Sequence, residues 1–239
     1  MQTIGLLGGM SWESSIEYYR IVNEQVGKRL GGLHSARCLM YSVNFGEIEP
    51  LMSAGRWQDI ADRLAQAAKR LELAGADFLL ICTNTMHKVA PQIQAAIDIP
   101  LLHIADAAGS RIKTAGIVSV ALLGTRFTMV EDFYRKRLSQ YYGLTVSIPT
   151  EAEIETVDRV IFEELCRGKI LDASKAAYGR IIERMAGEGA EAVVLGCTEI
   201  GLLVKEGDGS IPMFDTTRIH AEAAVDFALQ EIQNRFAML

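Results

Sequence analysis

The sequence lacks long hydrophobic runs, an excess of basic residues and paired cysteines. No uninterrupted apolar stretch approaches the ~20 residues that span a bilayer. Lys and Arg number 24 against 30 Asp and Glu, which gives a net charge of −6. An acidic chain without a basic run is a poor electrostatic partner for nucleic acid or for an anionic membrane surface. The sequence therefore predicts neither as a partner.

Export signals and cofactor fingerprints are missing as well. The N-terminus has no basic region and no cleavage site of a signal peptide. The four cysteines show no paired spacing, so we expect free thiols in a reducing cytoplasm; they are Cys38, Cys82, Cys166 and Cys197. Zinc-ligand spacing, the dinucleotide fingerprint and the P-loop are all absent. The sequence predicts no metal and no cofactor.

What is present is an alternation of short apolar runs with longer amphipathic stretches. The 239 residues, 49% of them hydrophobic, suffice for one large α/β domain or for two halves of ~110–120 residues. Predicted strands cover 3–7, 36–45, 78–82, 100–104, 118–123, 144–149, 190–195 and 211–214. Predicted helices cover 12–30, 57–74, 87–97, 128–142, 154–167, 171–187 and 217–236. This alternation indicates parallel sheet covered by helices on both faces.

An internal repeat divides the chain. Three anchors recur 112 to 116 residues later: Gly75-Ala76-Asp77 as Gly189-Ala190-Glu191, Leu6-Leu7-Gly8 as Leu122-Leu123-Gly124, and Ile99-Pro100 as Ile211-Pro212. The alternative is two ordinary α/β units with common glycine punctuation. Duplication predicts two similar α/β domains with parallel sheets, related by a pseudo-twofold axis. The first would cover 1–110 and the second 111–216, with the closing helix over 217–239 packing back on the first.

The repeat places Thr83 over Cys197, each directly after a predicted strand. Ligands of parallel sheets bind beyond the carboxyl ends of the strands, so a twofold axis would aim both residues at one cleft. Cys197 also precedes a predicted helix, a position that lowers a thiol pKa. We expect a reactive thiolate there, whereas an inert core cysteine fits Cys38 and Cys166 better. Gly196 would allow a ligand to approach the backbone closely.

Two loops offer groups for an anionic ligand. The loop over 8–12 follows a strand and precedes a helix, which suits either an anion on backbone N–H groups or a tight turn alone. Thr83, Asn84 and Thr85 could bind an anion or could simply cap a helix. Cys82 is expected to be the last inward residue of its strand, and His87 faces either the cleft or solvent.

Three motifs together resemble the aspartate/glutamate racemase family: Gly-Leu-Leu-Gly-Gly-Met-Ser at 5–11, Cys-Thr-Asn-Thr-Met-His at 82–87 and Gly-Cys-Thr-Glu at 196–199. The resemblance implies a cofactor-independent racemase, as a homodimer, with two α/β domains and one catalytic cysteine from each beside the substrate Cα. The first of those cysteines is Thr83 in this chain. Cys82 stands one residue early, which in a strand turns the side chain to the opposite face.

The resemblance also implies roles for further residues. Met10, Asn84, Thr85 and Thr198 would hold the substrate α-carboxylate. Met52 and Glu164 fall in the two regions that contact the substrate side chain, with Arg56 and Lys169 as nearby cations. The expected reaction is racemisation of aspartate or glutamate, favouring the L form, with Cys197 as the base and Thr83 on the reprotonating side. The alternatives are another enzyme of the superfamily (a broad-specificity or hydantoin racemase, a maleate isomerase, a decarboxylase) and a non-catalytic amino-acid-binding module.

Overall fold

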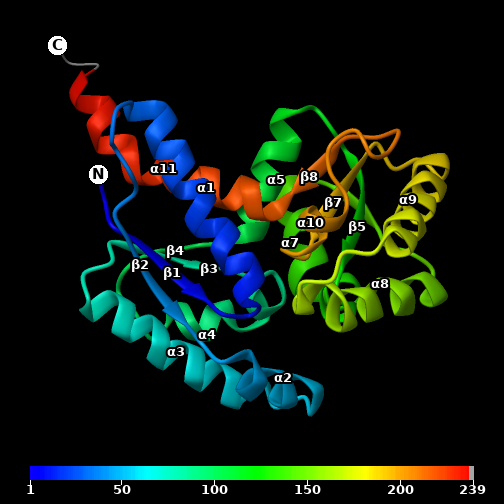
Figure 1. Ribbon diagram of the computed structural model, residues 1–239, viewed down its shortest axis with the longest axis horizontal. Coiled ribbons are helices and arrows are strands. Elements are labelled where there is room, and N and C mark those ends of the chain that lie inside the picture. Colours follow the sequence, from blue (N-terminus) through cyan, green and yellow to red (C-terminus); the bar gives the residue numbers. More distant parts are fainter. Residues whose placement is uncertain (237–239) are drawn as a thin grey trace. The chain divides into compact units, whose positions relative to one another are not determined.

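The computed structural model describes residues 1–236, and the side chains of residues 1–230. The chain divides into two compact units (Figure 1). The first comprises Met1–His103 and the C-terminal segment from His220; the second comprises Ile104–Ile219. Each unit holds a four-stranded, fully parallel sheet, which confirms the predicted fold class. The predicted domain boundaries at 110 and 216 stay a prediction, and residues 237–239 of the expected closing helix lie outside the described residues.

The sheet of the first unit has the strand order β2-β1-β3-β4. Its strands are β1 (Ile4–Gly8), β2 (Cys38–Ser42), β3 (Phe78–Ile81) and β4 (Leu101–Leu102). The helices between them are α1 (Trp12–Leu30), α2 (Phe45–Ser53), α3 (Trp57–Leu73), the 3-10 helix η1 (Thr85–Val89) and α4 (Ala90–Gln94). The central strands β1 and β3 are buried throughout, as expected for a parallel sheet with both faces covered.

The sheet of the second unit has the order β6-β5-β7-β8. Its strands are β5 (Ser119–Gly124), β6 (Thr145–Ser147), β7 (Ala192–Gly196) and β8 (Met213–Asp215). The helices are α5 (Ile104–Thr114), α6 (Arg126–Val130), α7 (Asp132–Tyr142), α8 (Glu151–Glu163), η2 (Leu165–Arg167), α9 (Asp172–Gly187), α10 (Ile200–Leu203) and, closing the chain, α11 (Thr216–Phe236). Strand for strand, this order repeats that of the first unit, and duplication accounts for it.

The register of the central strands shows that single residues related by the repeat have equivalent positions in the two sheets. Leu7 of β1 lies opposite Ile81 of β3. Leu123 of β5 lies opposite Leu195 of β7 in the second sheet. Because 123 and 195 are the repeat partners of 7 and 81, Thr83 and Cys197 each stand two residues beyond the equivalent strand pair.

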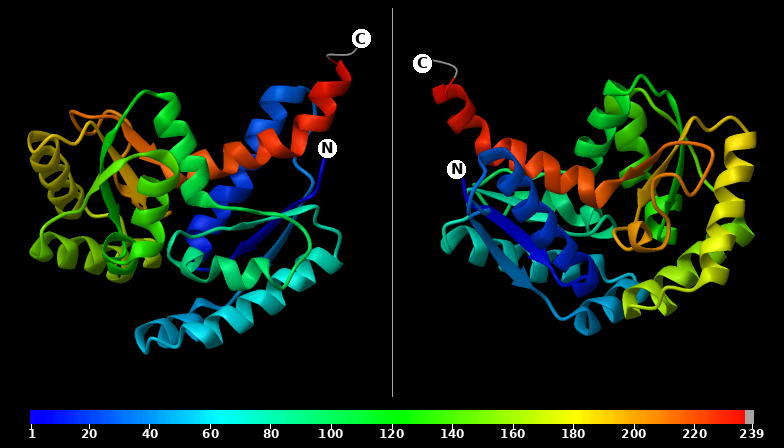
Figure 2. Two further views of the ribbon diagram at one scale, coloured as in Figure 1. Left: turned by 180° about the vertical axis from the view of Figure 1, so that it is seen from behind. Right: turned by 45° about the horizontal axis from the view of Figure 1, so that its top comes forward.

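Helices cover both faces of each sheet (Figure 2). In the first unit, one face packs on α1 and on α11, through Ala221, Ala224, Val225, Ala228 and Leu229. In the second unit, one face packs on α5 and α7 and the other on α8 and α9. The helix that follows the last strand of each sheet therefore joins the core of the other unit: α5 follows β4, and α11 follows β8.

The structure differs from the predicted elements at several places. The expected strand over 36–45 ends at Ser42, and α2 begins at Phe45 because Asn44 Oδ1 caps it by accepting from the Gly46 N–H. Helix α5 was not predicted at all. The helix expected over 128–142 is broken at Glu131, which is extended. Those expected over 87–97 and 154–167 are each split between a 3-10 and an α-helix. The central strands β1, β3, β5 and β7 nevertheless end within one residue of where they were predicted.

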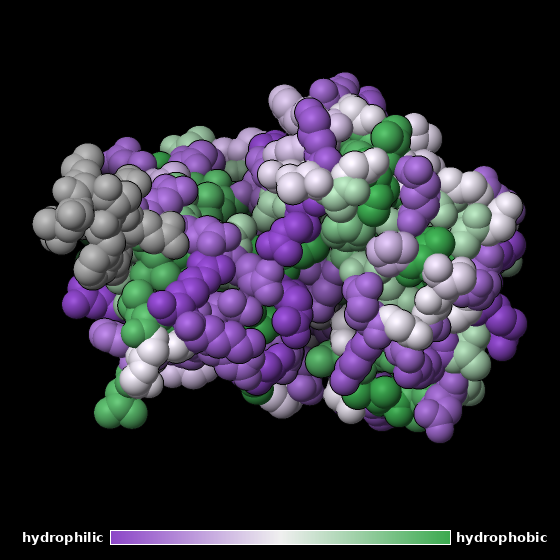
Figure 3. Space-filling view, turned by 90° about the horizontal axis from the view of Figure 1, so that it is seen from above, coloured by the Kyte–Doolittle hydropathy of each residue, from purple (hydrophilic) through white to green (hydrophobic). Residues whose placement is uncertain are grey.

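No helix among the described residues is long and apolar enough to span a membrane. On the face shown in Figure 3, hydrophilic and hydrophobic residues are interspersed.

Candidate active site

In the first unit, two loops leave the same edge of the sheet. The loop after β1 and the loop after β3 follow adjacent strands, and the Cys82 N–H donates to Leu7 O at 2.9 Å. The Ser14 hydroxyl, at the start of α1, reaches Cys82 O at 3.5 Å. The structure thereby brings together Met10, Thr83, Asn84 and Thr85, all of them buried.

The glycine loop is closed by its own serines. The Gly9 N–H donates to Ser15 Oγ at 2.8 Å, and the Ser15 hydroxyl donates to Ser11 O at 2.9 Å. Gly9 has φ +89°, and a Cβ there would lie 2.2 Å from Val43 O, so only glycine fits. The Gly9 amide, which an anion would need, is thus used inside the loop. Of the two interpretations, this favours the tight turn.

Thr83 and Cys82 lie on opposite sides of the sheet. Cys82 is fully buried in the core that β1 and β3 form with α1 and α11, as predicted. Burial raises the pKa of its thiol, so Cys82 is held neutral. Thr83 is 6% exposed, and its equivalence to Cys197, which packs with Val193 and Leu195, assigns it to the other face. The first unit therefore presents a hydroxyl, and no thiol, at this strand end.

A buried histidine, His87, is hydrogen-bonded to the loop that carries Thr83. His87 Nδ1 lies 2.8 Å from Thr83 O, and since a carbonyl only accepts, the ring must donate from Nδ1. Its ring stacks 4.4 Å from that of His103 and 6.0 Å from that of His220. Burial, and then the two neighbouring histidines, lower the pKa of His87 well below its usual range. His87 is a neutral buried donor, not the solvent-facing residue that the sequence left open.

In the second unit, the equivalent strand end carries a thiol–carboxylate pair. Cys197 is 7% exposed and continues the alternation of Val193 and Leu195 onto the α8/α9 face of the sheet. Its Sγ donates to Glu199 Oε2 at 2.9 Å. The Thr198 hydroxyl donates to the same oxygen at 2.9 Å. Sequence reasoning did not select Glu199, although it closes the Gly-Cys-Thr-Glu motif two residues after the thiol.

The expected lowering of the Cys197 pKa is wrong. Burial, followed by the negative charge of Glu199, raises the pKa of the thiol well above its usual range. The helix that begins nearby, α10, has only four residues, so its dipole is too weak to offset these effects. Cys197 is therefore a neutral thiol that donates a hydrogen bond to a carboxylate.

Gly196 is required by the neighbouring strand. A Cβ at Gly196 would lie 2.7 Å from Leu122 Cδ1 and 2.9 Å from Leu123 O. Close packing of β7 on β5, rather than the close approach of a ligand, accounts for this glycine. The loop beyond it is held by the Thr216 and Thr217 hydroxyls, which donate to Leu195 O at 2.7 Å and to Thr198 O at 3.3 Å.

The residues expected near the substrate side chain lie in both units. Met52 is buried on α2. Glu164 is buried at the end of α8, where Ser174 Oγ donates to one carboxylate oxygen at 2.5 Å and Arg159 Nη1 to the other at 3.1 Å.

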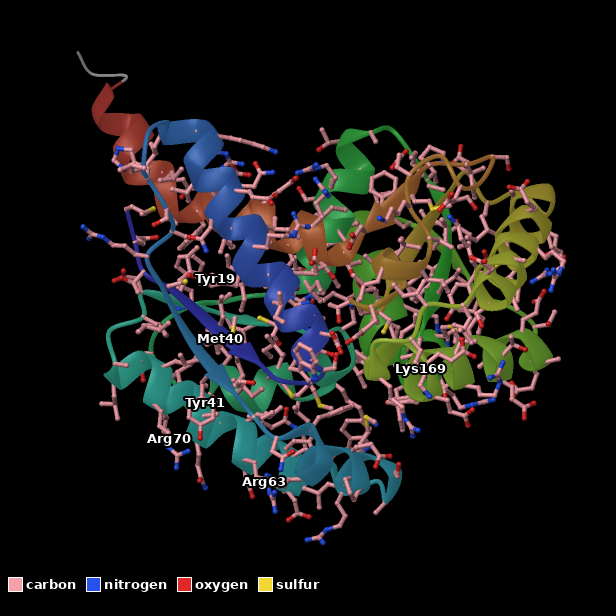
Figure 4. The ribbon with its side chains drawn as sticks, in the orientation of Figure 1. Tyr19, Met40, Tyr41, Arg63, Arg70 and Lys169 are labelled. Carbon is pink, nitrogen blue, oxygen red and sulfur yellow. The ribbon has the colours of Figure 1, made fainter. Side chains whose placement is uncertain are left out.

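The two candidate cations are exposed. Arg56 pairs with Asp59 at 2.5 Å. Lys169 lies in the turn after η2 (Figure 4), where its backbone N–H donates to Glu164 O at 2.9 Å. Neither cation is held in a buried position within its own unit.

The remaining cysteines correct a further expectation. Cys38 and Cys166 are half-buried, whereas Cys197 is buried. The interpretation of Cys38 and Cys166 as core cysteines is wrong, because each lies at the margin of its core cluster. Burial therefore does not distinguish Cys197 as the candidate for chemistry. Its hydrogen bond to the Glu199 carboxylate does.

Comparison with known proteins identifies the family. The profile of the Asp/Glu/Hydantoin racemase family matches residues 7–224. A Yersinia pestis protein assigned to the Asp/Glu racemases is 53% identical, with a TM-score of 0.89 over 96% of this chain and 100% of its own. An aspartate racemase homologue from Pyrococcus horikoshii OT3 is 37% identical, with a TM-score of 0.83 over 95% and 99% of the two chains.

A broad specificity amino-acid racemase, RacX of Bacillus subtilis (strain 168), is 22% identical over 93% of this chain and 96% of its own. Racemases of this kind are isomerases. Since the profile spans most of the residues and both units, the chain belongs to the Asp/Glu/Hydantoin racemase family.

Proposed function

We propose that the protein is a cofactor-independent racemase of aspartate or glutamate that works most efficiently from the L form. The observation that carries the proposal is the thiol–carboxylate pair of Cys197 and Glu199 at the strand end of the second unit. Its repeat equivalent in the first unit is the Thr83 hydroxyl. In this proposal both strand ends act on one substrate molecule.

Cys197 removes the Cα proton with the help of Glu199. The buried thiol already donates to the carboxylate at 2.9 Å, so its proton passes to Glu199 as the sulfur takes up the Cα proton. The Cα–H bond breaks, a new S–H bond forms, and the electron pair stays on the substrate as a carbanion. Because Glu199 can accept the thiol proton during the step, Cys197 does not need to be ionised beforehand.

Thr83 stands on the reprotonating side. A threonine hydroxyl is a far weaker acid than a thiol, but it can donate or relay a proton to a strongly basic carbanion. It does not readily become an anionic base, so proton removal from the D form is slow. Both directions share one equilibrium constant. The difference between the L and the D form therefore lies in the separate values of kcat and KM, which change together.

Small polar side chains and backbone around the two strand ends bind the substrate. Met10, Asn84, Thr85 and Thr198 hold the α-carboxylate. Met52 and Glu164 contribute to the side-chain region. Because both Glu164 oxygens accept hydrogen bonds within the second unit, this residue acts chiefly by fixing the turn between α8 and η2.

Proton exchange at Cα tests the proposal. The protein is incubated in deuterium oxide with L- and D-aspartate and L- and D-glutamate, and NMR follows the Cα proton signal while chiral chromatography follows the product. We expect faster exchange from an L acid than from its D partner, without added pyridoxal phosphate or metal. Absence of exchange with all four would overturn the proposal.

Decarboxylation is the second candidate, because Cys197 is a single thiol held in its protonated form. Loss of CO2 from a disubstituted malonate leaves a carbanion that needs one proton donor and no second base. Measurement of released CO2, with aryl- and alkylmalonates as substrates, separates the two reactions. CO2 release without exchange from any amino acid would favour the decarboxylase.

A further inference from the structure

The first unit contains a cavity of about 470 Å³ at the outer edge of its sheet. The end of β2, the start of α2 and one face of α3 enclose it. Two arginines and a tyrosine line it, Arg63 and Arg70 from α3 and Tyr41 from β2 (Figure 4). Its volume lies within the range of ~300–1,000 Å³ that is usual for small-molecule sites. None of the proposed substrate residues lines it.

The two guanidinium groups are presented by one helix face. Arg63 and Arg70 are seven residues apart, which is two turns of α3 and an axial separation of about 10.5 Å. Gln66 lies between them and lines the same cavity. Helical spacing thus directs two cations and an amide toward the same cavity. Because arginine side chains are long and flexible, the two guanidinium groups can both reach the two acidic groups of one small molecule.

Tyr41 holds the Arg70 side chain in place, but no carboxylate among the described side chains offsets its positive charge. It donates to the Tyr41 hydroxyl, and its guanidinium lies over the Tyr41 ring, 5.5 Å from the centroid. A hydroxyl partner, unlike a carboxylate, does not offset the charge of the guanidinium group. Across the side chains of residues 1–230, no carboxylate forms an ion pair with Arg70. A guanidinium has five N–H donors, so the bond to Tyr41 leaves most of them for a ligand.

One carboxylate opposes the two cations. Glu47 pairs with Arg63 at 3.5 Å, with the Arg63 side chain 51% exposed and that of Glu47 64% exposed. Glu47 also accepts from Asn44 Nδ2 at 3.1 Å. An exposed pair of this length stabilises little and can open for a ligand. Of the three charges that line the cavity, two are positive.

The edge strand adds uncharged donors. The Val43 N–H donates to Gly8 O at 3.0 Å, toward β1. Because N–H groups alternate along a strand, the Ser42 N–H points away from β1, and β2 is the last strand of this sheet. The Ser42 N–H therefore lies at the open edge of the sheet, and Ser42 lines the cavity.

From this arrangement we propose a second ligand site, for a small organic anion that carries two acidic groups, either phosphates or carboxylates. One acidic group binds Arg63, displacing Glu47, and the other binds Arg70 beside Tyr41 and Ser42. Guanidinium groups bind both kinds of acid through paired N–H donors. This proposal does not depend on the proposed racemase activity.

Isothermal titration calorimetry on the full chain tests the site with three probes: inorganic pyrophosphate, inorganic phosphate and succinate. We expect saturable binding of one equivalent of pyrophosphate or succinate, at least about tenfold tighter than phosphate, because two charge-assisted contacts replace one. Whichever of pyrophosphate and succinate binds more tightly shows whether the site prefers phosphates or carboxylates. Absence of saturable binding for all three, or equal affinity for all three, would overturn the proposal.

Matched variants locate the binding. Arg63→Gln and Arg70→Gln should each weaken the best probe about tenfold or more, and Glu47→Gln should tighten it severalfold. Lys69→Gln removes one positive charge from the same helix outside this cavity and should change the affinity less than twofold. Equal losses in Lys69→Gln and the arginine variants would show only general charge attraction and would refute the site.

Sedimentation velocity on the same variants distinguishes a ligand site from a subunit contact. If the cavity binds a small anion, Arg63→Gln and Arg70→Gln keep the oligomeric state of the parent protein. If they dissociate an oligomer, the arginines bind a second copy of the chain and the ligand site is refuted. Circular dichroism confirms that each variant is folded before either measurement is read.

Discussion

The two strand ends after β3 and β7 have the same place in the same strand order but opposite chemistry. After β3 stands the Thr83 hydroxyl, whose carbonyl accepts from a buried neutral histidine. After β7 stands the Cys197 thiol, which donates to a buried carboxylate. The first strand end carries no thiol, and the second carries a thiol whose proton already has a carboxylate acceptor. The two sheets thus share one strand order while the side chains at these two positions differ.

This difference teaches that position in the sheet and chemical role are separate properties. The carboxyl ends of parallel strands supply ligand-facing positions in any such unit. What those positions do depends on the side chains and on their buried partners. The predictions below test whether Cys197 and Thr83 are as unequal as their surroundings indicate.

The largest effect is expected from Cys197→Ser. A serine alkoxide is a much poorer base at neutral pH, so Cα exchange should fall by about a thousandfold or more while circular dichroism and thermal unfolding stay close to those of the parent. NMR in deuterium oxide measures the exchange. Exchange at the parental rate would mean that Cys197 is not the base.

Glu199→Gln should reduce exchange from the L form by about a hundredfold, which is within the range for loss of a general base. The negative charge of Glu199 helps to raise the Cys197 pKa, so an additional increase in the parental rate, from the ionised thiolate, should appear only in the alkaline range. In the variant this increase should move to lower pH, because that charge is gone, while the maximal rate falls. A faster rate at neutral pH would show that Glu199 hinders the thiol and accepts no proton.

Thr83→Cys should bring the two directions closer together. Threonine and cysteine are similar in volume, so the change should be tolerated, and a second thiol should raise the initial rate from the D acid severalfold or more. Cys82→Ala is the control, because Cys82 lies in the core on the other side of the sheet. If Cys82→Ala abolished the reaction and Thr83→Cys had no effect, Cys82 would be the second base.

The smallest effect concerns alkylation. The sequence alone predicted that Cys197 would react first, but its buried, neutral thiol reverses that order. Iodoacetamide near neutral pH should modify the half-buried Cys166 and Cys38 before Cys197, and substrate should slow Cys197 further. Peptide mass spectrometry over time measures the order. Preferential modification of Cys197 would show that its thiol is ionised after all.

Much of the fold was predictable because its signals are local. Buried parallel strands appear as short apolar runs, and the glycine after Leu7 and after Leu123 marks the strand ends in both units. Helix α2 could not be predicted in the same way: it begins at an Asn44 cap directly after an apolar strand and contains Pro50. Helix α5 was missed although Ile104, Ala108 and Ile112 recur at helical spacing, because its first residue was assigned to the preceding strand; its apolar side buries against α7 in the folded chain.

The sequence by itself determined the family motifs, the recurrence of three anchors 112 to 116 residues apart and the presence of Thr83 at the repeat position of Cys197, because all three are properties of residue order. Only the tertiary structure decided that Cys197 is neutral. Its pKa depends on burial and on the distance to the Glu199 carboxylate, and neither can be read from spacing alone. The same holds for His87, whose neutral state follows from the packing of residues 103 and 220 against its ring. Side-chain charge in a protein interior is set by neighbours that the chain brings together only when it folds.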